Sequence, residues 1–228
     1  MTTISEDDKE VRKASTFNTA ATESATLLQR LEQFSDWFKA NKAMAVCIRY
    51  VKKLKNIAKI RDPKDQTEQN ALHGSITVDE LVTAERLIVK QVQAETFKEE
   101  ISRLKNSSHK GTERKTRDRE NTVTKSSSIY RLDPFLDEHG ILRVGGRIQQ
   151  ASISEDVKHP IILPKANHVS FWVARHFHKT SNHQGRGFTL NEIRYSGYWI
   201  VGCSILVSRM IQNCVTCRKR KSARTEKG

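Results

Sequence analysis

Apolar residues recur at helical spacing through the first part of the chain. Two stripes of this kind predict two successive amphipathic helices, the first ending near Asn41 and the second beginning near Met44. The first stripe consists of Leu27, Leu28, Leu31, Phe34 and Phe38, and the second of Met44, Cys47, Ile48, Val51, Leu54 and Ala58. Cys47 has no candidate ligand near it in sequence, so we expect it to be a small buried side chain.

A third helical stretch follows residues 63–74, which we expect to form a linker. Thr77 and Glu80 have the Thr-x-x-Glu spacing of a capping box, in which each side chain binds a backbone N–H at the start of a helix. The apolar-periodic run after them predicts one long helix from Val78 to Lys105. We expect this helix to face a core or a partner rather than to carry catalytic groups.

From residue 129 the pattern changes to short apolar runs between turn residues. Ile129–Leu132 and Ile141–Val144 flank Asp133–Gly140, and this order predicts a β-hairpin. Pro160–Pro164 predicts a short extended segment, because a proline stands at each end.

Helical spacing returns in the last third of the chain. Helices are predicted over 165–179, 189–195 and 203–213, with Thr189 as an N-cap and Glu192 three residues after it. The fold is therefore expected to be mainly α. It would comprise N-terminal amphipathic helices and a long linker, a small β-hairpin segment, and a three-helix bundle of helix-turn-helix type.

Charge, hydropathy and cysteine content indicate which partners and which cellular setting the chain suits. The 228 residues carry a net charge of +14 and the pI is about 9.8, which favours a polyanionic partner, most commonly nucleic acid. No apolar run reaches the roughly 18 residues of a membrane span, and Met1–Lys13 is too charged for a signal peptide. Two of the four cysteines stand in a Cys-x-x-Cys pair, which indicates a reducing, intracellular setting with a metal rather than disulfides.

Two histidines and two cysteines near the C-terminus have the spacing of a metal site. Four residues separate His178 from His183, 30 residues follow His183, and Cys214 and Cys217 then form the Cys-x-x-Cys pair. Two imidazoles and two thiolates fill the tetrahedral shell of Zn²⁺ and leave no position for water or substrate. The sequence therefore predicts one structural zinc ion, which would also stabilise a bundle too small to bury much apolar area.

The first histidine ligand has a rival. His176 would leave a six-residue gap to His183, whereas the shorter loop after His178 constrains the pair better, so we favour His178. His139 and His159 lack a partner at metal-ligand spacing and are expected at the surface. The competing interpretation of the whole cluster is two unrelated histidines beside a chance cysteine pair.

These residues carry a resemblance to a known family. The segments His178–Gly185, Thr189–Leu190, Tyr198–Ile200 and Cys214–Lys219 resemble the His-His-Cys-Cys zinc-binding domain of retroviral and retrotransposon integrases. Leu132–Arg147 and His159–Pro164 are similar to the stretch that precedes this domain in Pol polyproteins of BEL/Pao-type elements. The resemblance covers roughly residues 25–221 and is most specific from Leu132 onward.

The resemblance implies a helix-turn-helix-like bundle with His178, His183, Cys214 and Cys217 as zinc ligands. It also implies roles in multimerisation and in holding element-end DNA. In such integrases, catalysis belongs to a following ribonuclease-H-like core with two aspartates and a glutamate. The chain ends 11 residues after Cys217, so we expect no catalysis from it.

On this interpretation the chain divides into six segments. They are a disordered lead (1–24), a helical connector (25–105), a basic flexible linker (106–128), a small β-containing extension (129–164), an integrase zinc-binding domain (165–221) and a basic tail (222–228). The expected function is a zinc-binding, DNA-associating region of a retrotransposon integrase, located in the nucleus. DNA would be contacted by Arg218, Lys219, Arg220 and Lys221. We expect DNA and a second copy of the chain as partners, and neither a membrane nor a small-molecule substrate. The alternative is a zinc-stabilised protein–protein or self-association module, co-opted by the host.

Overall fold

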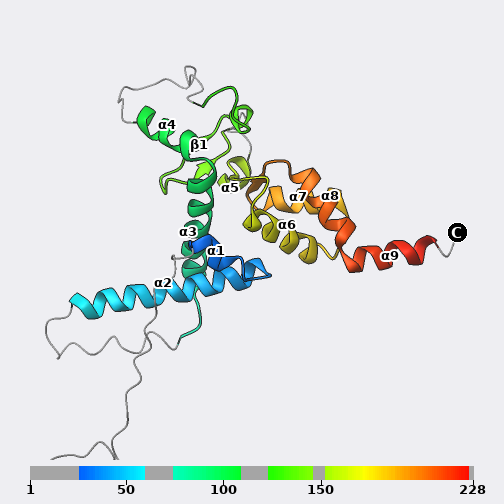
Figure 1. The fold of residues 1–228 in the computed structure, drawn as a ribbon, viewed down its shortest axis with the longest axis horizontal. Helices are drawn as coiled ribbons and strands as arrows, with labels where there is room; N and C mark the ends of the chain where they lie inside the picture. The colour runs from blue at the N-terminus through cyan, green and yellow to red at the C-terminus, as the bar shows by residue number, and fades with distance from the viewer. Residues whose placement is uncertain (1–25, 60–73, 109–122, 146–151, 226–228) are drawn as a thin grey trace, which may run out of the picture.

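The computed structural model describes residues 26–59, 74–108, 123–145 and 152–225. Within these ranges the protein is mainly helical with a small β segment, as predicted (Figure 1). The β segment is a four-stranded sheet, where a hairpin was expected. The longer helices are α2 (Trp37–Lys59), α3 (Val78–Thr96), α4 (Lys98–Ser108), α6 (His168–Thr180), α7 (Arg186–Tyr195), α8 (Cys203–Asn213) and α9 (Val215–Thr225). None of the described helices is long and apolar enough to cross a membrane. The predicted lead, and residues 63–73 of the first predicted linker, lie outside the described residues.

The N-terminal helices divide earlier than predicted. The short helix α1 (Leu27–Leu31) begins at Thr26, which forms a capping box with Gln29. Asp36 then accepts hydrogen bonds from the backbone N–H groups of Phe38 and Lys39, and so starts α2. The break expected near residue 42 falls inside α2, a stretch with neither glycine nor proline.

The helix α2 packs against α3, and a salt bridge fixes the start of α3. Thr77 and Glu80 form the predicted capping box. Arg49 of α2 donates from Nε and Nη2 to the two carboxylate oxygens of Glu80, at 2.7 and 2.5 Å. These hydrogen bonds hold the pKa of Glu80 at about 2. Cys47 is exposed, so its predicted burial is wrong: it lies away from the side of α2 that packs on α3.

The long helix predicted over residues 78–105 is interrupted. Phe97 has φ −114° and ψ 37°, outside the helical range, and it separates α3 from α4. Its side chain is buried in a small apolar cluster with Ile129, Leu142 and Ile162, which explains why the chain departs from the helix there. The ends of the predicted basic linker belong to the fold, since residues 106–108 complete α4 and Val123 is buried in the same cluster.

A hairpin is present, but its first strand lies within residues 133–140, which were expected to form the turn. The strands β1 (Phe135–Leu136) and β2 (Leu142–Arg143) pair in antiparallel fashion. The turn between them is held by Asp137, whose carboxylate accepts the N–H groups of His139 and Ile141. Residues 129–132 were expected to form a strand; Tyr130–Leu132 instead form a 3₁₀ turn, which ends at Asp133 in the left-handed region, φ 47°.

The sheet continues into the C-terminal region. The strand β3 (Ile161–Leu163), the predicted extended segment, pairs in antiparallel fashion with β2 and in parallel with β4 (Tyr198–Ile200), giving the order β1-β2-β3-β4. A short helix, α5 (Glu155–Lys158), precedes β3, and α6 and α7 cross over from β3 to β4. The predicted boundary at residue 164 therefore separates two strands that are neighbours in one sheet.

One apolar core joins the N-terminal and C-terminal helices. Buried side chains that contribute to it include Ala45 of α2, Ile88 of α3, Trp172 of α6 and Met210 of α8. The predicted connector and the predicted zinc-binding domain are thus packed together over a common core.

A buried glutamine joins α3 to the sheet. Gln93 is completely buried; its Nε2 donates to the carbonyl oxygens of Leu142 (2.9 Å) and Ile162 (2.8 Å), and its Oε1 accepts the Leu142 N–H at 2.7 Å. The side-chain amide thereby satisfies backbone groups of β2 and β3 beside their single paired position.

Candidate metal centre

The helix α6 delivers His178 to the interior. Asn167 caps this helix by accepting the Val169 N–H at 2.8 Å. Its buried face carries Val169, Trp172 and Val173 against the core, and His178 lies in its last turn with only 2% of its surface exposed. The predicted position of His178 at the end of a helix is confirmed.

A tight turn after α6 points His183 back toward His178. Asn182 and His183 both adopt left-handed backbone conformations, with φ of 51° and 59°. Asparagine and histidine are among the non-glycine residues that most often occupy this region. The His183 N–H donates to the His178 carbonyl at 3.0 Å, which closes the turn. Four residues therefore suffice to bring the two imidazoles face to edge, with ring centroids 4.5 Å apart.

The two cysteines lie where α8 gives way to α9. Cys214 is the C-cap of α8, with an extended backbone, and Cys217 lies in the first turn of α9. The predicted bounds of α8 are confirmed, whereas α9 itself was not predicted. Both thiols are half-buried and face the histidine turn.

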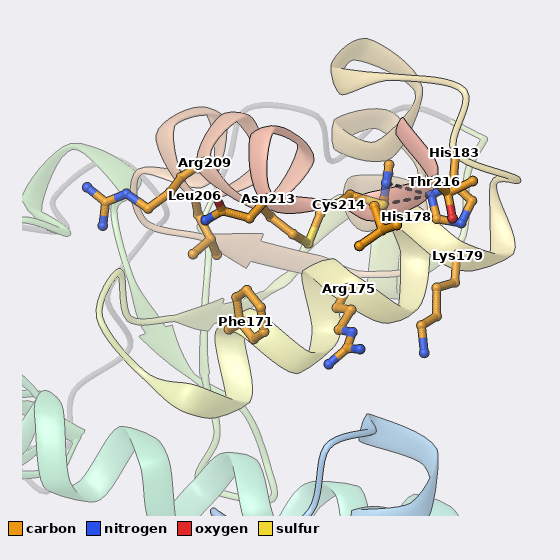
Figure 2. A pocket seen from close by; sticks show the side chains of 12 residues that line it. Phe171, Arg175, His178, Lys179, His183, Leu206, Arg209, Asn213, Cys214 and Thr216 are labelled. Atoms are coloured by element: carbon orange, nitrogen blue, oxygen red, sulfur yellow. Dashed lines mark hydrogen bonds between the residues drawn. The ribbon is translucent and has the colours of Figure 1, made fainter. Parts of the chain in front are cut away.

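The four side chains converge on one point. His183 Nδ1 lies 2.9 Å from His178 Nε2 and 3.3 Å from Cys214 Sγ, and Cys217 Sγ lies 3.3 Å from His178 Nε2. One ligand atom from each residue lies within 4.8 Å of all the others. A tetrahedral Zn²⁺ with ordinary bond lengths has ligand–ligand edges of about 3.3–3.8 Å. The group could therefore hold a metal ion after small adjustments; Figure 2 shows Cys214 beside the two histidines.

Thr189 sets the tautomer of His178. Its hydroxyl donates to the Gly185 carbonyl oxygen at 2.8 Å. Because the hydroxyl proton is used there, the Thr189 oxygen acts as the acceptor for His178 Nδ1, which lies 3.2 Å away. Nδ1 then carries the imidazole proton, and the lone pair of Nε2 points at the other three ligands. Sequence reasoning missed this role, because it took Thr189 for an N-cap. The N-cap of α7 is Gly185, whose φ of 100° favours glycine.

The protonation states suit a metal ligand set. Burial, assisted by the charge of His183, lowers the pKa of His178 and so favours the neutral imidazole. Burial raises the pKa of the Cys214 thiol, but hydrogen bonds from Cys217 and Thr216 outweigh it, and the net pKa falls. The pKa of Cys217 rises through burial and its contact with Cys214.

Among the residues that the structure describes, the other histidines and cysteines lie apart from this group. His176 is half-buried and makes an edge contact with Phe177, and the convergent ligand is His178, as predicted. His139 is exposed and His159 is half-buried, with Nδ1 3.0 Å from the Val144 carbonyl oxygen. Cys203 packs against the core, and burial raises the pKa of its thiol to about 11.

The predicted DNA-contacting residues all lie on α9, the helix that begins at the cluster. Arg218, Lys219, Arg220 and Lys221 are exposed. Arg220 donates from Nη1 to the Asn182 carbonyl at 2.9 Å, so it also ties α9 to the histidine turn. Figure 1 shows α9 projecting from the body of the protein.

A groove of about 420 Å³ borders the cluster between α6 and the α8–α9 junction (Figure 2). Phe171, Leu206 and Met210 contribute its apolar lining, and Arg175 and Lys179 contribute two of its cations. Arg175 donates to the Ser35 carbonyl at 3.3 Å, and Lys179 lies 3.7 Å from the Asp36 carboxylate. This edge of the groove therefore helps to hold the α1–α2 connection against α6.

With four protein ligands, a bound ion would hold the α6–α7 turn to the α8–α9 junction and would have no open position for hydrolysis. The basic side chains of α9 begin one residue beyond the last ligand. Comparison of the chain with protein-family models, with curated proteins and with solved structures found no match in any of the three.

Proposed function

We propose that the protein binds one structural Zn²⁺ through His178, His183, Cys214 and Cys217. The observation that carries this proposal is the convergence of two imidazole nitrogens and two thiol sulfurs within 4.8 Å. Mixed nitrogen and sulfur ligands in a closed tetrahedral set favour zinc over magnesium or calcium, which prefer oxygen. The ion fixes the fold around it and performs no chemistry.

We further propose that the zinc-bound protein associates with DNA as the zinc-binding region of a retrotransposon integrase, in the nucleus and without catalysis of its own. The His-first ligand order, the net charge of +14 and the basic helix attached to the site support this function. Zinc would act indirectly, because Cys217 lies in α9 and Arg220 of the same helix reaches the histidine turn. The ion therefore orients the cations that contact phosphate.

A metal titration and a DNA titration of the full chain test the proposal together. Native mass spectrometry of chain exposed to equal Zn²⁺, Mg²⁺ and Ca²⁺ should show one bound zinc, lost in Cys217→Ser. Duplex DNA should bind the zinc-loaded chain, and its affinity should fall steeply from 50 to 200 mM salt. Arg218→Gln with Lys219→Gln should lower the salt slope by about 2, because each phosphate contact contributes about 0.9.

The matched control removes the same charge elsewhere. Lys98→Gln with Lys105→Gln neutralises two exposed lysines of α4, far along the chain from α9, and should leave the salt slope unchanged. Equal losses in the two double variants would show that only net charge matters. DNA affinity that is independent of salt would contradict phosphate binding altogether.

The competing function is a zinc-stabilised protein–protein or self-association module. Exposed apolar side chains on α2 support some protein contact. The solution mass of the zinc-loaded chain distinguishes self-association, because a dimer that forms without DNA would favour this module.

A further inference from the structure

The helix α2 has two apolar faces, of which only one is covered by the described residues. On one face, Met44, Ala45 and Ile48 pack into the common core beside α3, and Arg49 binds Glu80. A surface helix normally presents one apolar stripe to the core and polar residues to solvent. A second apolar stripe beside the core-facing one therefore requires an explanation.

The second stripe, which we call the outer face of α2, consists of Val46, Cys47, Tyr50, Val51 and Leu54. Val46, Tyr50 and Leu54 recur every four residues, and Cys47 and Val51 lie four apart beside them, so at about 100° per residue the five share one side of the helix. The exposed fractions of Tyr50, Val51 and Leu54 are 54%, 49% and 63%, and Cys47 is exposed as well. In Figure 1 the C-terminal half of α2 extends beyond α3, with no described helix or strand along it.

The charges that α2 itself contributes around the outer face are all of one sign. The 23 residues of α2 include no Asp or Glu but seven Lys or Arg residues. At 100° per residue, Lys53 borders the row Val46–Tyr50, and Lys55 borders Val51 on the other edge. The face is thus an apolar strip between basic margins, a pattern that suits an amphipathic helix with acidic margins.

We propose that the outer face of α2 binds an acidic amphipathic helix of another protein. Apolar residues of the partner cover Tyr50, Val51 and Leu54, and its carboxylates lie against Lys53 and Lys55. Such a contact is outside the metal centre and independent of the DNA-binding function proposed for α9.

Charge and composition favour this occupant over three others. A second copy of α2 would bring its own lysines and arginines against the same basic margins, which is unfavourable. DNA phosphates would pair with the lysines but leave the apolar strip exposed. A membrane-surface helix uses Trp, Phe and several Leu residues as anchors, whereas this strip offers one leucine and neither Trp nor Phe.

The test uses the zinc-loaded full chain and a synthetic three-heptad helical peptide with Leu at a and d and Glu at e and g. Fluorescence anisotropy should detect binding of this peptide, while the same peptide with Lys in place of Glu should not bind. Val51→Gln with Leu54→Gln should weaken binding of the acidic peptide at least tenfold. Lys53→Gln with Lys55→Gln should weaken it less and reduce its salt dependence.

The matched control replaces two exposed apolar side chains elsewhere. Phe188→Gln with Ile205→Gln, at positions 58% and 57% exposed, should leave peptide binding unchanged. Thermal melts of all variants verify that each remains folded. Equal binding of the acidic and basic peptides, or binding unaffected by Val51→Gln with Leu54→Gln, would overturn the proposal.

Two further outcomes would assign the face to another occupant. If the wild-type chain is a dimer that Val51→Gln with Leu54→Gln converts to a monomer, the face is a self-association surface. If the acidic peptide does not bind, but vesicles of phosphatidylserine and phosphatidylcholine bind in a way that this double variant abolishes, the face is a membrane-contact surface. Either result overturns the acidic-helix proposal and leaves the metal-centre proposal unaffected.

Discussion

Two junctions hold this protein together, and they rely on different chemistry. At the sheet junction, α3 meets β2 and β3 through buried apolar side chains and through Gln93, whose amide satisfies three backbone groups. At the ligand junction, the α6–α7 turn meets the α8–α9 connection through four potential metal ligands and the hydrogen bond from Arg220 to Asn182.

The difference lies in what each junction needs to be complete. Gln93 is buried with its amide oxygen and nitrogen both hydrogen-bonded, so the sheet junction requires no further group. The ligand junction places two imidazole nitrogens 2.9 Å apart beside two thiols, and the adjoining Val215 is exposed rather than packed. With the proposed zinc bound, such a junction would gain most of its stability from the ion, so the two junctions should respond differently to metal removal.

Metal removal should have the largest effect, and it should destabilise the ligand junction while leaving the sheet junction intact. A strong chelator should abolish amide protection in the 178–185 turn and in α9, while α3 and the sheet keep theirs. Structural zinc contributes an apparent binding free energy of about 10–16 kcal/mol in zinc-finger peptides. Hydrogen exchange followed by mass spectrometry, with and without chelator, measures the contrast segment by segment.

Cys217→Ser should reproduce the chelated pattern in the presence of zinc. Cys47→Ser is the matched control, because Cys47 is an exposed thiol outside the ligand group. Protection unaffected by chelator would refute the dependence of the ligand junction on a metal. Loss of protection throughout α3 would instead show that the common core transmits the effect.

Replacement of Gln93 should destabilise the sheet junction. Gln93→Leu keeps a similar volume but leaves the Leu142 N–H and the Leu142 and Ile162 carbonyls without the amide. Buried backbone groups without partners cost about 1–3 kcal/mol each, so we expect a loss of about 3 kcal/mol. Urea unfolding at saturating zinc measures it. Gln91→Leu, two positions away and bonded only to Glu95 among the described residues, should change stability by less than about 0.5 kcal/mol; equal losses would contradict the role of Gln93.

Spacing in the sequence was enough to predict the ligand junction but not its support. The four ligands and the end of α6 follow from the His-x4-His and Cys-x-x-Cys patterns, and the structure brings all four together. Thr189 was wrongly interpreted as an N-cap. Glu192 follows it by three residues, and this Thr-x-x-Glu spacing is that of a capping box. Only the three-dimensional turn shows that it contacts His178 instead.

The sheet junction was largely hidden from sequence reasoning. A single glutamine on a helix has no periodic pattern, and the strand of residues 198–200 pairs with 161–163 across a long crossover. Phe97 continues the helical stripe in sequence, yet its packing with Ile129 interrupts the helix. Long-range packing decides these features, and local spacing does not encode them.

Thr189 supports the ligand junction through its contact with His178. Its substitution should have a smaller effect than metal removal. Thr189→Val removes the hydroxyl that accepts the His178 Nδ1–H and should lower zinc affinity about 10–100-fold. Thr189→Ser keeps the hydroxyl and should retain most of the affinity. Competition against a chromophoric chelator measures both variants. Equal zinc affinities for valine and serine would show that packing, rather than the hydrogen bond, is what Thr189 provides.

The smallest effect should come from Glu85, which links α3 to β4 near the sheet junction. Burial raises the pKa of Glu85, and it also raises that of Tyr198, whose hydroxyl donates to the Glu85 carboxylate. A carboxyl with a raised folded-state pKa stabilises the fold below its unfolded pKa, near 4.5, and this stability is lost as pH rises through the folded value. Ionisation of this half-buried carboxyl as pH rises therefore costs stability.

Glu85→Gln removes that charge while its Oε1 still accepts the Tyr198 hydroxyl. We expect a rise of about a few degrees in Tm at pH 8, and a smaller difference at pH 5.5, with zinc loading equal in both chains. Glu155→Gln is the control, because Lys158 lowers the pKa of Glu155 and its neutralisation should bring no gain. A Tm difference independent of pH would mean that Glu85 acts by packing alone. The stability of the sheet junction would then not depend on an ionisable group. The ligand junction would differ in this respect, because protonation of His178 and the two thiols competes with metal binding.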